Sequence, residues 1–266
     1  LLYRLGQSKY RQRFILKGAM LQTIWLADPF RPTRDLDLLG HGDSEPETVR
    51  TIFQEILTIE CDDGVVFDLD DLSVEPIREE TEYGGQRVET TARIAGARLK
   101  VRVDLGFGDA VTPDANEIAY PALLDQPTPK VRAYPKETVV AEKLQAIVAL
   151  GATNGRMKDF YDLWMMSQHF SFEGALLAKA IAATFARRRT PLPTDTPIGL
   201  SDQFSTDTAV ARRWEFFTTR NVLSEPPGAL SDVVAALRGF LMPVVRLAAG
   251  SAAGASLWPP GGPWST

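Results

Sequence analysis

The sequence has almost none of the residues that form disulfides or zinc sites. Its 266 residues include one cysteine, Cys61, and two histidines, His41 and His169. A single cysteine excludes an internal disulfide and is typical of a protein in the reducing cytoplasm, where we expect this one to reside. Zinc sites in proteins are usually built from several cysteines and histidines, which this chain does not offer. Any bound metal ion is therefore expected to have oxygen ligands.

Long apolar runs are also missing. No segment approaches the ~20 apolar residues that a helix needs to cross a bilayer, so we expect no membrane contact. Hydrophobic residues make up 44% of the chain and charged residues 24%, which is ordinary for a globular protein. The length allows one large domain or two smaller ones, each with its own core.

Charge is distributed unevenly along the chain, whose net charge is −5. Residues 1–125 hold 14 Lys and Arg against 23 Asp and Glu, whereas residues 126–266 hold 15 against 11. The basic surplus of the second part suits a polyanion, although uneven surface composition explains it equally well.

The order of sequence patterns predicts an α+β fold. Periodicity and breaker residues indicate a strand or turn entering a helix near Gly18, a strand ending at Gly40, a helix over 45–57, a hairpin over 86–109 and helices from 136 onward. A helix, a strand and a helix that precede a run of strands are typical of an α+β domain around a mixed sheet.

The domain boundary is expected where prolines accumulate. Four prolines lie between residues 120 and 136. Such segments commonly connect domains. We therefore predict one domain over 1–125, a mainly helical domain over 126–250 and a flexible tail over 251–266, since the tail lacks any packing period.

The segment PTRDLDLLG, residues 32–40, places two aspartates one residue apart among leucines. In a strand, Asp35 and Asp37 point to one face, while Leu36 and Leu38 point to the other. Two carboxylates this close repel each other, so the arrangement predicts a cation between them. A hard divalent cation prefers such oxygen ligands.

Two further segments add to this predicted site. Gly18 and Ala19 stand at an expected helix start, where backbone N–H groups and the helix dipole attract a phosphate. Asp104 lies in the alternating strand VRVDL, and a third carboxylate would help to hold two Mg²⁺ ions for phosphoryl transfer. The alternative for Asp104 is a surface residue that pairs with Lys100 or Arg102.

Five segments carry a resemblance to a known family. They are, in order, RFILKGAMLQTIWL…RPTRDLDLLG, VEPIREETEYGG, VRVDLGFGD, PKETVVAEKLQAI and RMKDFYDL. Together they resemble the AbiEii/AbiGii-type nucleotidyltransferase toxins of bacterial toxin–antitoxin and abortive-infection systems. The resemblance covers roughly residues 1–170 and implies a polymerase-β-like nucleotidyltransferase domain, followed by a mainly helical domain that completes the active site.

The resemblance also implies which residues perform the reaction. Asp35, Asp37 and Asp104 match metal-binding and catalytic positions, and Lys143 and Asp159 match two further catalytic positions.

A nucleotide-binding group follows from the same resemblance. It comprises Lys17, Gly18, Ala19, Arg34 and Lys143. Ala19 replaces a Gly or Ser of the family, so a backbone contact with the triphosphate would persist here, whereas a hydroxyl contact would not.

Helix periodicity gives physical roles to the last two catalytic positions. Lys143 is expected to reach phosphate oxygens, although an exposed lysine beside Glu142 has the same pattern. Asp159 and Asp162 lie three residues apart and share a helix face. One of them is expected to orient Lys143 or to accept a proton from the attacking hydroxyl. A surface ion pair with Arg156 is the alternative.

By resemblance, the protein is expected to transfer nucleotides from NTP to RNA with Mg²⁺, most simply to the 3′ end of tRNA, and so to block translation. A cognate antitoxin protein is an expected partner. The alternatives are transfer to a protein or small molecule, a non-catalytic nucleotide-binding partner protein, and a metal-dependent nuclease.

Basic residues late in the chain are candidates for contact with an RNA backbone. They are the run 187–189 and the later Arg212, Arg213 and Arg220. A solvated helix end gives the same pattern, and the sequence shows no RNA-recognition module with an aromatic signature.

Overall fold

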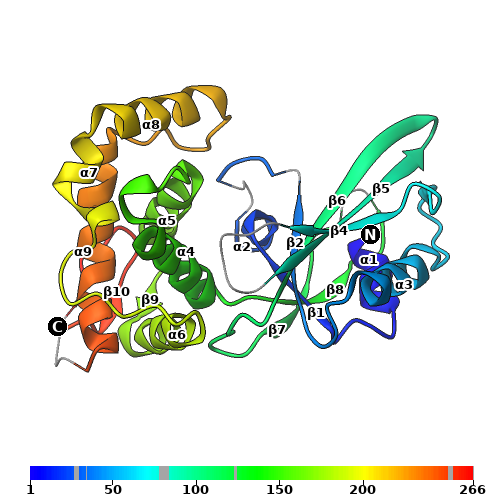
Figure 1. The fold of residues 1–266 in the computed structure, drawn as a ribbon, viewed down its shortest axis with the longest axis horizontal. Coiled ribbons are helices and arrows are strands. Elements are labelled where there is room, and N and C mark those ends of the chain that lie inside the picture. Colours follow the sequence, from blue (N-terminus) through cyan, green and yellow to red (C-terminus); the bar gives the residue numbers. More distant parts are fainter. Residues whose placement is uncertain (27–29, 34, 78–83, 123–124, 251–253, 266) are drawn as a thin grey trace. The chain divides into compact units, whose positions relative to one another are not determined.

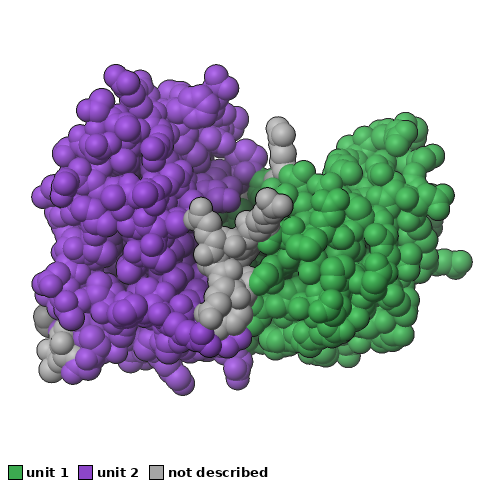
Figure 2. All heavy atoms as spheres, viewed as in Figure 1, with its two compact units in different colours: residues 1–29, 33–109, 115–134 green, residues 30–32, 110–114, 135–266 purple. Residues whose placement is uncertain are grey.

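The computed structural model describes residues 1–26, 30–33, 35–77, 84–122, 125–250 and 254–265. The chain forms two compact units, coloured green and purple in Figure 2. Unit 1 comprises Leu1–Pro29, Thr33–Asp109 and Ala115–Tyr134, and unit 2 comprises Phe30–Pro32, Ala110–Asp114 and Pro135–Thr266. The division after Tyr134 lies later than the predicted boundary at 125, and two short earlier segments belong to unit 2.

Unit 1 is built on an eight-stranded mixed sheet (Figure 1). Its strand order is β3-β5-β6-β2-β1-β8-β7, and β4 also pairs with β5. The pairs β2–β6 and β1–β8 are parallel, and the other pairs are antiparallel. The strands are β1 (Phe14–Lys17), β2 (Leu36–Gly40), β3 (Val66–Phe67), β4 (Ser73–Ile77), β5 (Gly85–Ile94), β6 (Ala97–Phe107), β7 (Asn116–Ala119) and β8 (Lys130–Ala133).

The longest strands, β5 and β6, form the hairpin that the sequence predicts. Ala95 and Gly96 make its two-residue turn, and both have positive φ, 47° and 84°. Positive φ at both central positions matches the right-handed twist of the flanking strands. Along β6, Val103 and Leu105 are buried, so Asp104 between them faces the other side of the sheet.

Helices of unit 1 are short apart from α3. They are α1 (Leu2–Gln7), the 3-10 turn η1 (Ala19–Leu21), α2 (Gln22–Trp25) and α3 (Pro46–Leu57). Proline is favoured in the first turn of a helix, where α3 has Pro46. Val49, Ile52, Phe53 and Ile56 are buried at helical spacing, which confirms the predicted helix over 45–57. Near Gly18, the predicted longer helix is a 3-10 turn followed by the four-residue α2.

Unit 2 is mainly helical, which confirms the predicted α+β class with a helical second part (Figure 1). Helix α4 packs against α6, and α9 packs against both α5 and α6. The elements are α4 (Lys136–Leu150), η2 (Gly151–Thr153), α5 (Met157–His169), β9 (Phe172–Glu173), α6 (Gly174–Arg187), η3 (Ile198–Leu200), α7 (Asp202–Thr206), α8 (Thr208–Arg220), α9 (Leu230–Ala248) and β10 (Leu257–Trp258). None of the described helices is long and apolar enough to span a bilayer.

Residues 254–265 pack on unit 2, which differs from the predicted flexible tail. Strand β10 pairs with β9, and Trp258 Nε1 donates to the carbonyl of Ser167 at 2.7 Å. Trp264 stacks on Phe240 and donates to its carbonyl at 2.7 Å. Two isolated tryptophans with one polar atom each anchor this segment, and such contacts leave no periodic signal in the sequence.

Removing the Trp258 anchor should destabilise unit 2. Trp258 is 6% exposed, so Trp258→Ala leaves a cavity and removes one of the two hydrogen bonds that the Ser167 carbonyl accepts, and we expect a loss of about 3–5 kcal/mol in the free energy of unfolding. Urea denaturation followed by circular dichroism measures it. The neighbouring Leu257 is 49% exposed, so Leu257→Ala should change stability by less than about 0.5 kcal/mol. Equal effects of the two substitutions would contradict the packing.

Candidate functional site

The predicted carboxylates of unit 1 come together on one face of the sheet. Asp37 on β2 lies directly opposite Asp104 on the parallel strand β6. Asp35 stands immediately before β2, two residues from Asp37, so alternation turns both toward the same face. Leu36 and Leu38 point to the opposite face and are buried. Asp37 thus has a carboxylate neighbour along its own chain and another across the sheet.

Gly18 brings the backbone close to the Asp37 side chain. Its φ of 75° and ψ of −163° belong to a region that only glycine readily occupies. A Cβ atom at Gly18 would lie 2.0 Å from Asp37 Oδ2. Glycine is therefore required here both by backbone conformation and by the space that the carboxylate fills. The next residue, Ala19, is buried at the start of η1.

Arginine side chains of the hairpin pair with the acidic residues on this face. Arg87 Nε and Nη2 each lie 2.8 Å from an oxygen of Asp104, which makes a bidentate pair. Arg102 Nε lies 2.7 Å from Glu89 Oε1, and its Nη1 lies 3.5 Å from Asp35 Oδ1. The hydrogen bond to Asp104 raises the pKa of Arg87, so the arginine stays charged and holds the carboxylate.

Strand register explains these pairs. In the β5–β6 hairpin, Arg87 is directly opposite Asp104, and Glu89 is directly opposite Arg102. Residues directly opposite one another share a face and are close enough to form ion pairs. The sequence already holds this information, because both pairs follow by counting back from the turn.

Lys17 is one of two basic residues in unit 1 that are predicted to bind nucleotide. It ends β1 directly opposite Asp37 in the strand register. Its Nζ lies 2.8 Å from Asp109 Oδ2 and 5.4 Å from the centre of the Tyr134 ring. This ammonium group is thus held at the end of its strand by an acidic and an aromatic neighbour. The second residue, Arg34, lies outside the described residues.

The donor chemistry of this face suits a hard cation, but one of its carboxylates, Asp104, is occupied by an arginine. Over the described part of the chain, no three Asp, Glu, His or Cys side chains are arranged to hold one metal ion. Both oxygens of Asp104 accept hydrogen bonds from Arg87. The opposed backbone positions of Asp37 and Asp104 fit a shared ion if Asp104 exchanges the arginine for the metal.

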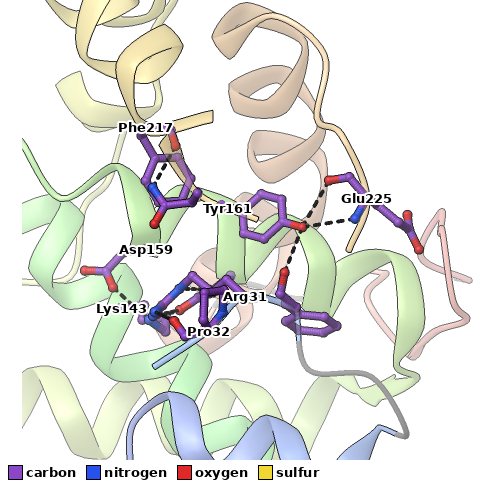
Figure 3. Close-up of polar contacts among 10 residues, drawn as sticks. Arg31, Pro32, Lys143, Asp159, Tyr161, Phe217 and Glu225 are labelled. Carbon is purple, nitrogen blue, oxygen red and sulfur yellow. Dashed lines mark hydrogen bonds and ion pairs between the residues drawn. The ribbon is translucent and has the colours of Figure 1, made fainter. Parts of the chain in front are cut away.

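A second charged cluster lies in unit 2 (Figure 3). Lys143 Nζ donates to Asp159 Oδ1 at 2.7 Å and to Asp162 Oδ2 at 2.9 Å. Arg31 binds Asp162 through Nε and Nη2, both at 2.9 Å. Arg156 Nε lies 2.6 Å from Asp159 Oδ2 as an ion pair without hydrogen-bond alignment. We call these five residues the Lys143 cluster. It contains three cations and two carboxylates.

The fold of unit 2 places these residues together. Lys143 lies on α4, and the two aspartates lie on α5. Because they are three residues apart, both aspartates lie on the same face of α5 and point toward the lysine. Arg31 arrives from a distant part of the sequence, next to Phe30. The carbonyl of Phe30 accepts hydrogen bonds from Tyr161 Oη at 3.2 Å and from the Ser224 amide at 3.1 Å. Tyr161 is fully buried, so its ring belongs to the core of unit 2.

Burial and charge act in opposite directions on the pKa values of the Lys143 cluster. Both aspartate side chains are only 1% exposed. Burial favours the neutral form of Asp162, but Lys143 and Arg31 outweigh it and lower its pKa from 3.8 to about 2. Burial also opposes the charged form of Lys143, yet Asp159 and Asp162 raise its pKa. Despite its burial, the pKa of Asp159 is also lowered by Lys143 and Arg156, so Lys143, Asp159 and Asp162 all remain charged at neutral pH.

The structure assembles the predicted residues within each unit. Unit 1 contains Asp35, Asp37 and Asp104, together with Gly18, and unit 2 contains Lys143 and Asp159. The motifs do not single out Arg31 or Arg87, although each binds one of the aspartates with two hydrogen bonds.

The sequence matches a family model over most of its length. The model describes the nucleotidyl transferase AbiEii toxin of type IV toxin–antitoxin systems, and it matches residues 1–238. The chain belongs to the AbiEii family. The matched region extends beyond the roughly 170 residues that carry the motifs and includes α8 and half of α9.

Solved structures support the same fold for this AbiEii family member. The chain is similar to JHP933 from Helicobacter pylori, with 14% identity, a TM-score of 0.52, and coverage of 94% of this chain and 89% of that one. It is equally similar to an H. pylori protein described provisionally as a nucleotidyltransferase, with 14% identity, a TM-score of 0.52, and coverage of 94% and 92%. No curated protein matches the sequence.

Breaking the Lys143 cluster should destabilise unit 2. Asp162→Asn leaves Lys143 and Arg31 without their shared carboxylate, and we expect a loss of about 3 kcal/mol or more in the free energy of unfolding. Denaturant titration at neutral pH measures it. The matched control is Asp202→Asn, because Asp202 pairs with Arg238 but is 80% exposed, so its loss should cost less than about 1 kcal/mol.

The stability of Asp162→Asn should depend less on acid pH than that of the parent protein. Since the pKa of Asp162 is about 2 in the folded protein and 3.8 is its usual value, its ionisation stabilises the fold above pH 3.8. That stability, about 2 kcal/mol, is lost as the pH falls from about 4 through about 2. Unfolding free energies measured across this range should therefore fall less steeply in Asp162→Asn than in the parent. Parallel curves would contradict the assigned pairing.

Gly18→Ala should destabilise unit 1 by displacing the Asp37 carboxylate. The backbone conformation costs alanine about 1–3 kcal/mol, and the overlap with Asp37 adds to it. Gly96→Ala is the control, because Gly96 also has positive φ, 84°, but its Cβ would meet nothing within 4 Å. Denaturation should show a larger loss for Gly18→Ala. Equal losses in the free energy of unfolding would mean that backbone strain alone requires glycine at position 18, and that the Asp37 carboxylate does not contribute.

Proposed function

We propose that this AbiEii family protein is a Mg²⁺-dependent enzyme that transfers nucleotides from NTP to RNA, at the 3′ end of tRNA, and so blocks translation. The observation that carries the proposal is the close arrangement of Gly18, Asp37 and Asp104 on one sheet face, in a chain of a nucleotidyltransferase family. Membership in a type IV toxin–antitoxin family also implies an antitoxin protein as partner.

The proposed ligands of Mg²⁺ are Asp35, Asp37 and Asp104. When bound, the metal lowers the pKa of an attacking hydroxyl and neutralises charge on the leaving pyrophosphate. The chain's own part is to hold the carboxylates in place before the ion arrives. Arg87 does this for Asp104, and Arg102 lies near Asp35, so mutual repulsion among the acids is offset without metal.

Gly18 has a defined task in this proposal. Because it has no side chain, the β1–η1 backbone can approach Asp37, which leaves the carboxylate its position on the sheet face. By the family resemblance, we expect the triphosphate to contact the backbone at Gly18 and Ala19. A backbone contact with phosphate is compatible with alanine at position 19, since only the N–H group is needed.

The Lys143 cluster is proposed to bind phosphate oxygens. Its five side chains comprise three cations and two carboxylates, and cations are the groups that bind phosphate oxygens. Asp159 and Asp162 fix the Lys143 ammonium group between them, which lowers the entropy lost when it contacts a phosphate. Since the raised pKa of Lys143 keeps it charged, its proposed role is electrostatic rather than that of a base.

The acceptor is the least constrained part of the proposal. The basic surplus of the second half of the chain supports RNA over a protein or small molecule. A non-catalytic nucleotide-binding partner protein is the other candidate, and three acids on one face favour an enzyme over it, because repelling carboxylates are costly to keep together.

The decisive experiment is label transfer from each α-labelled NTP in the presence of Mg²⁺ and total bacterial RNA. The parent protein should label a tRNA-sized band, and Asp37→Asn should reduce the rate at least ~100-fold, because several kcal/mol of charge stabilisation would be lost. Asp70→Asn is the control, since Asp70 is an exposed acid of the same unit, and it should retain activity.

The outcomes separate the candidates. Label in a protein or small molecule, lost in Asp37→Asn, would keep the chemistry and change the acceptor. Label that persists in Asp37→Asn would overturn the proposed site. If no acceptor takes label from any nucleotide while NTP still binds, the non-catalytic function is correct.

A further inference from the structure

Helix α8 presents a basic and aromatic surface that the proposed catalytic residues do not use. Arg212, Phe216 and Arg220 recur every four residues, so they form one stripe along the helix, about 12 Å long. All three are exposed, and so is Arg213 on the neighbouring side. We call these four residues the α8 face. Figure 1 shows α8 at the edge of unit 2.

The arginines of the α8 face have no acidic partners. Arg212, Arg213 and Arg220 form no ion pair with any residue in the described part of the chain. Other arginines of unit 2 differ, since Arg31 and Arg156 both bind aspartates. Glu215 is the one acid within the α8 sequence, so the helix carries three arginines against a single carboxylate and keeps a surplus of positive charge for an anionic partner.

Phe216 adds a flat apolar surface among these charges. Its side chain is 58% exposed, which is unusual for a large aromatic residue. The Arg220 guanidinium lies 4.5 Å from the centre of its ring. An exposed ring beside a guanidinium can stack on a nucleobase while the arginine binds the adjacent phosphate.

The helix is firmly fixed although much of it is exposed. Asp207 caps its start, accepting hydrogen bonds from the amides of Ala209 and Val210 at 2.9 and 3.0 Å. Trp214 is buried, and its Nε1 donates to the Gly228 carbonyl at 3.1 Å. The α8 face is therefore presented by a rigid support, which reduces the entropy lost on binding.

On its inner side, α8 meets the helix that carries the aspartates of the Lys143 cluster. Phe217 points toward Tyr161 of α5, with ring centres 5.9 Å apart (Figure 3). At the start of α5, a Cβ atom on Gly155 would lie 4.0 Å from Arg213 Nη1, and the next residue is Arg156 of the cluster. A nucleic acid strand bound along α8 would therefore extend toward the Lys143 cluster.

We propose that the α8 face binds a single-stranded segment of the RNA acceptor. Arg212, Arg213 and Arg220 contact its phosphates, and Phe216 stacks on one base. The inference rests on the proposed function for the identity of RNA as the acceptor. An acidic protein would also satisfy the arginines, but RNA places a base beside every phosphate, which matches the alternation of Arg212, Phe216 and Arg220 along α8, and so RNA fits the surface better.

Binding of a fluorescent single-stranded oligoribonucleotide, measured by anisotropy over a range of salt concentrations, tests the proposal without any catalysis. In Arg212→Gln/Arg220→Gln, the affinity should fall tenfold or more, and the slope of log K against log salt should decrease by about 1.4, since each lost phosphate contact removes about 0.7. Phe216→Ala and Phe216→Leu should each weaken binding about fivefold or more, because neither side chain stacks on a base.

The matched control is Lys179→Gln/Arg246→Gln, which removes the same charge from exposed positions on α6 and α9. It should leave the slope and affinity close to those of the parent. Equal losses in the two double variants, or unchanged binding in both Phe216 variants, would overturn the α8 proposal.

Label transfer to RNA in the same variants separates this inference from the proposed function. If the parent labels RNA and the α8 variants bind and label it equally well, the α8 proposal fails while the enzyme function stands. If the parent binds RNA through α8 but transfers no label to it, the surface is correct and the proposed acceptor is wrong. If the parent binds poly-glutamate but not the oligoribonucleotide, the α8 face is assigned to an acidic protein and the RNA proposal fails.

Discussion

Repulsion between neighbouring carboxylates is the constraint on which the rest of this structure depends. Unit 1 places Asp37 opposite Asp104, and unit 2 buries Asp159 beside Asp162. The repulsion within each pair is offset by nearby cationic side chains. A bidentate arginine holds Asp104 in the first unit, and in the second Lys143 lies between both acids. The arginine fixes the position of the Asp104 carboxylate in unit 1, and in unit 2 the cations lower the pKa of both buried aspartates.

Much of the fold, and part of the site, follows from local rules that a sequence displays. The alternation of aspartate and leucine over residues 35–38 predicts which side chains enter the core. The two-residue turn of the hairpin sets the strand register that places Arg87 opposite Asp104. Spacing of three on α5 likewise predicts that both aspartates face one lysine. These features need only the geometry of a single element or of a single pair of strands.

Other features depend on contacts between distant segments, and local rules miss them. Arg31 reaches Asp162 across 131 residues, and only the folded path of the chain brings them together. The packed segment 254–265 is fixed by two tryptophan side chains rather than by any repeated pattern. The expected helix near Gly18 begins as a 3-10 turn and continues for only four residues as α2, and the backbone at its start closely approaches Asp37.

The path of the chain also limits how such a protein can evolve. Neither unit is one continuous stretch, because Phe30–Pro32 and Ala110–Asp114 belong with the helices while the sequence around them belongs with the sheet. Recombination at a single crossover could not exchange one unit intact. A crossover near residue 134 would combine Arg31 from one parent with Asp162 from another, so hybrids should survive only where both parents kept this pair.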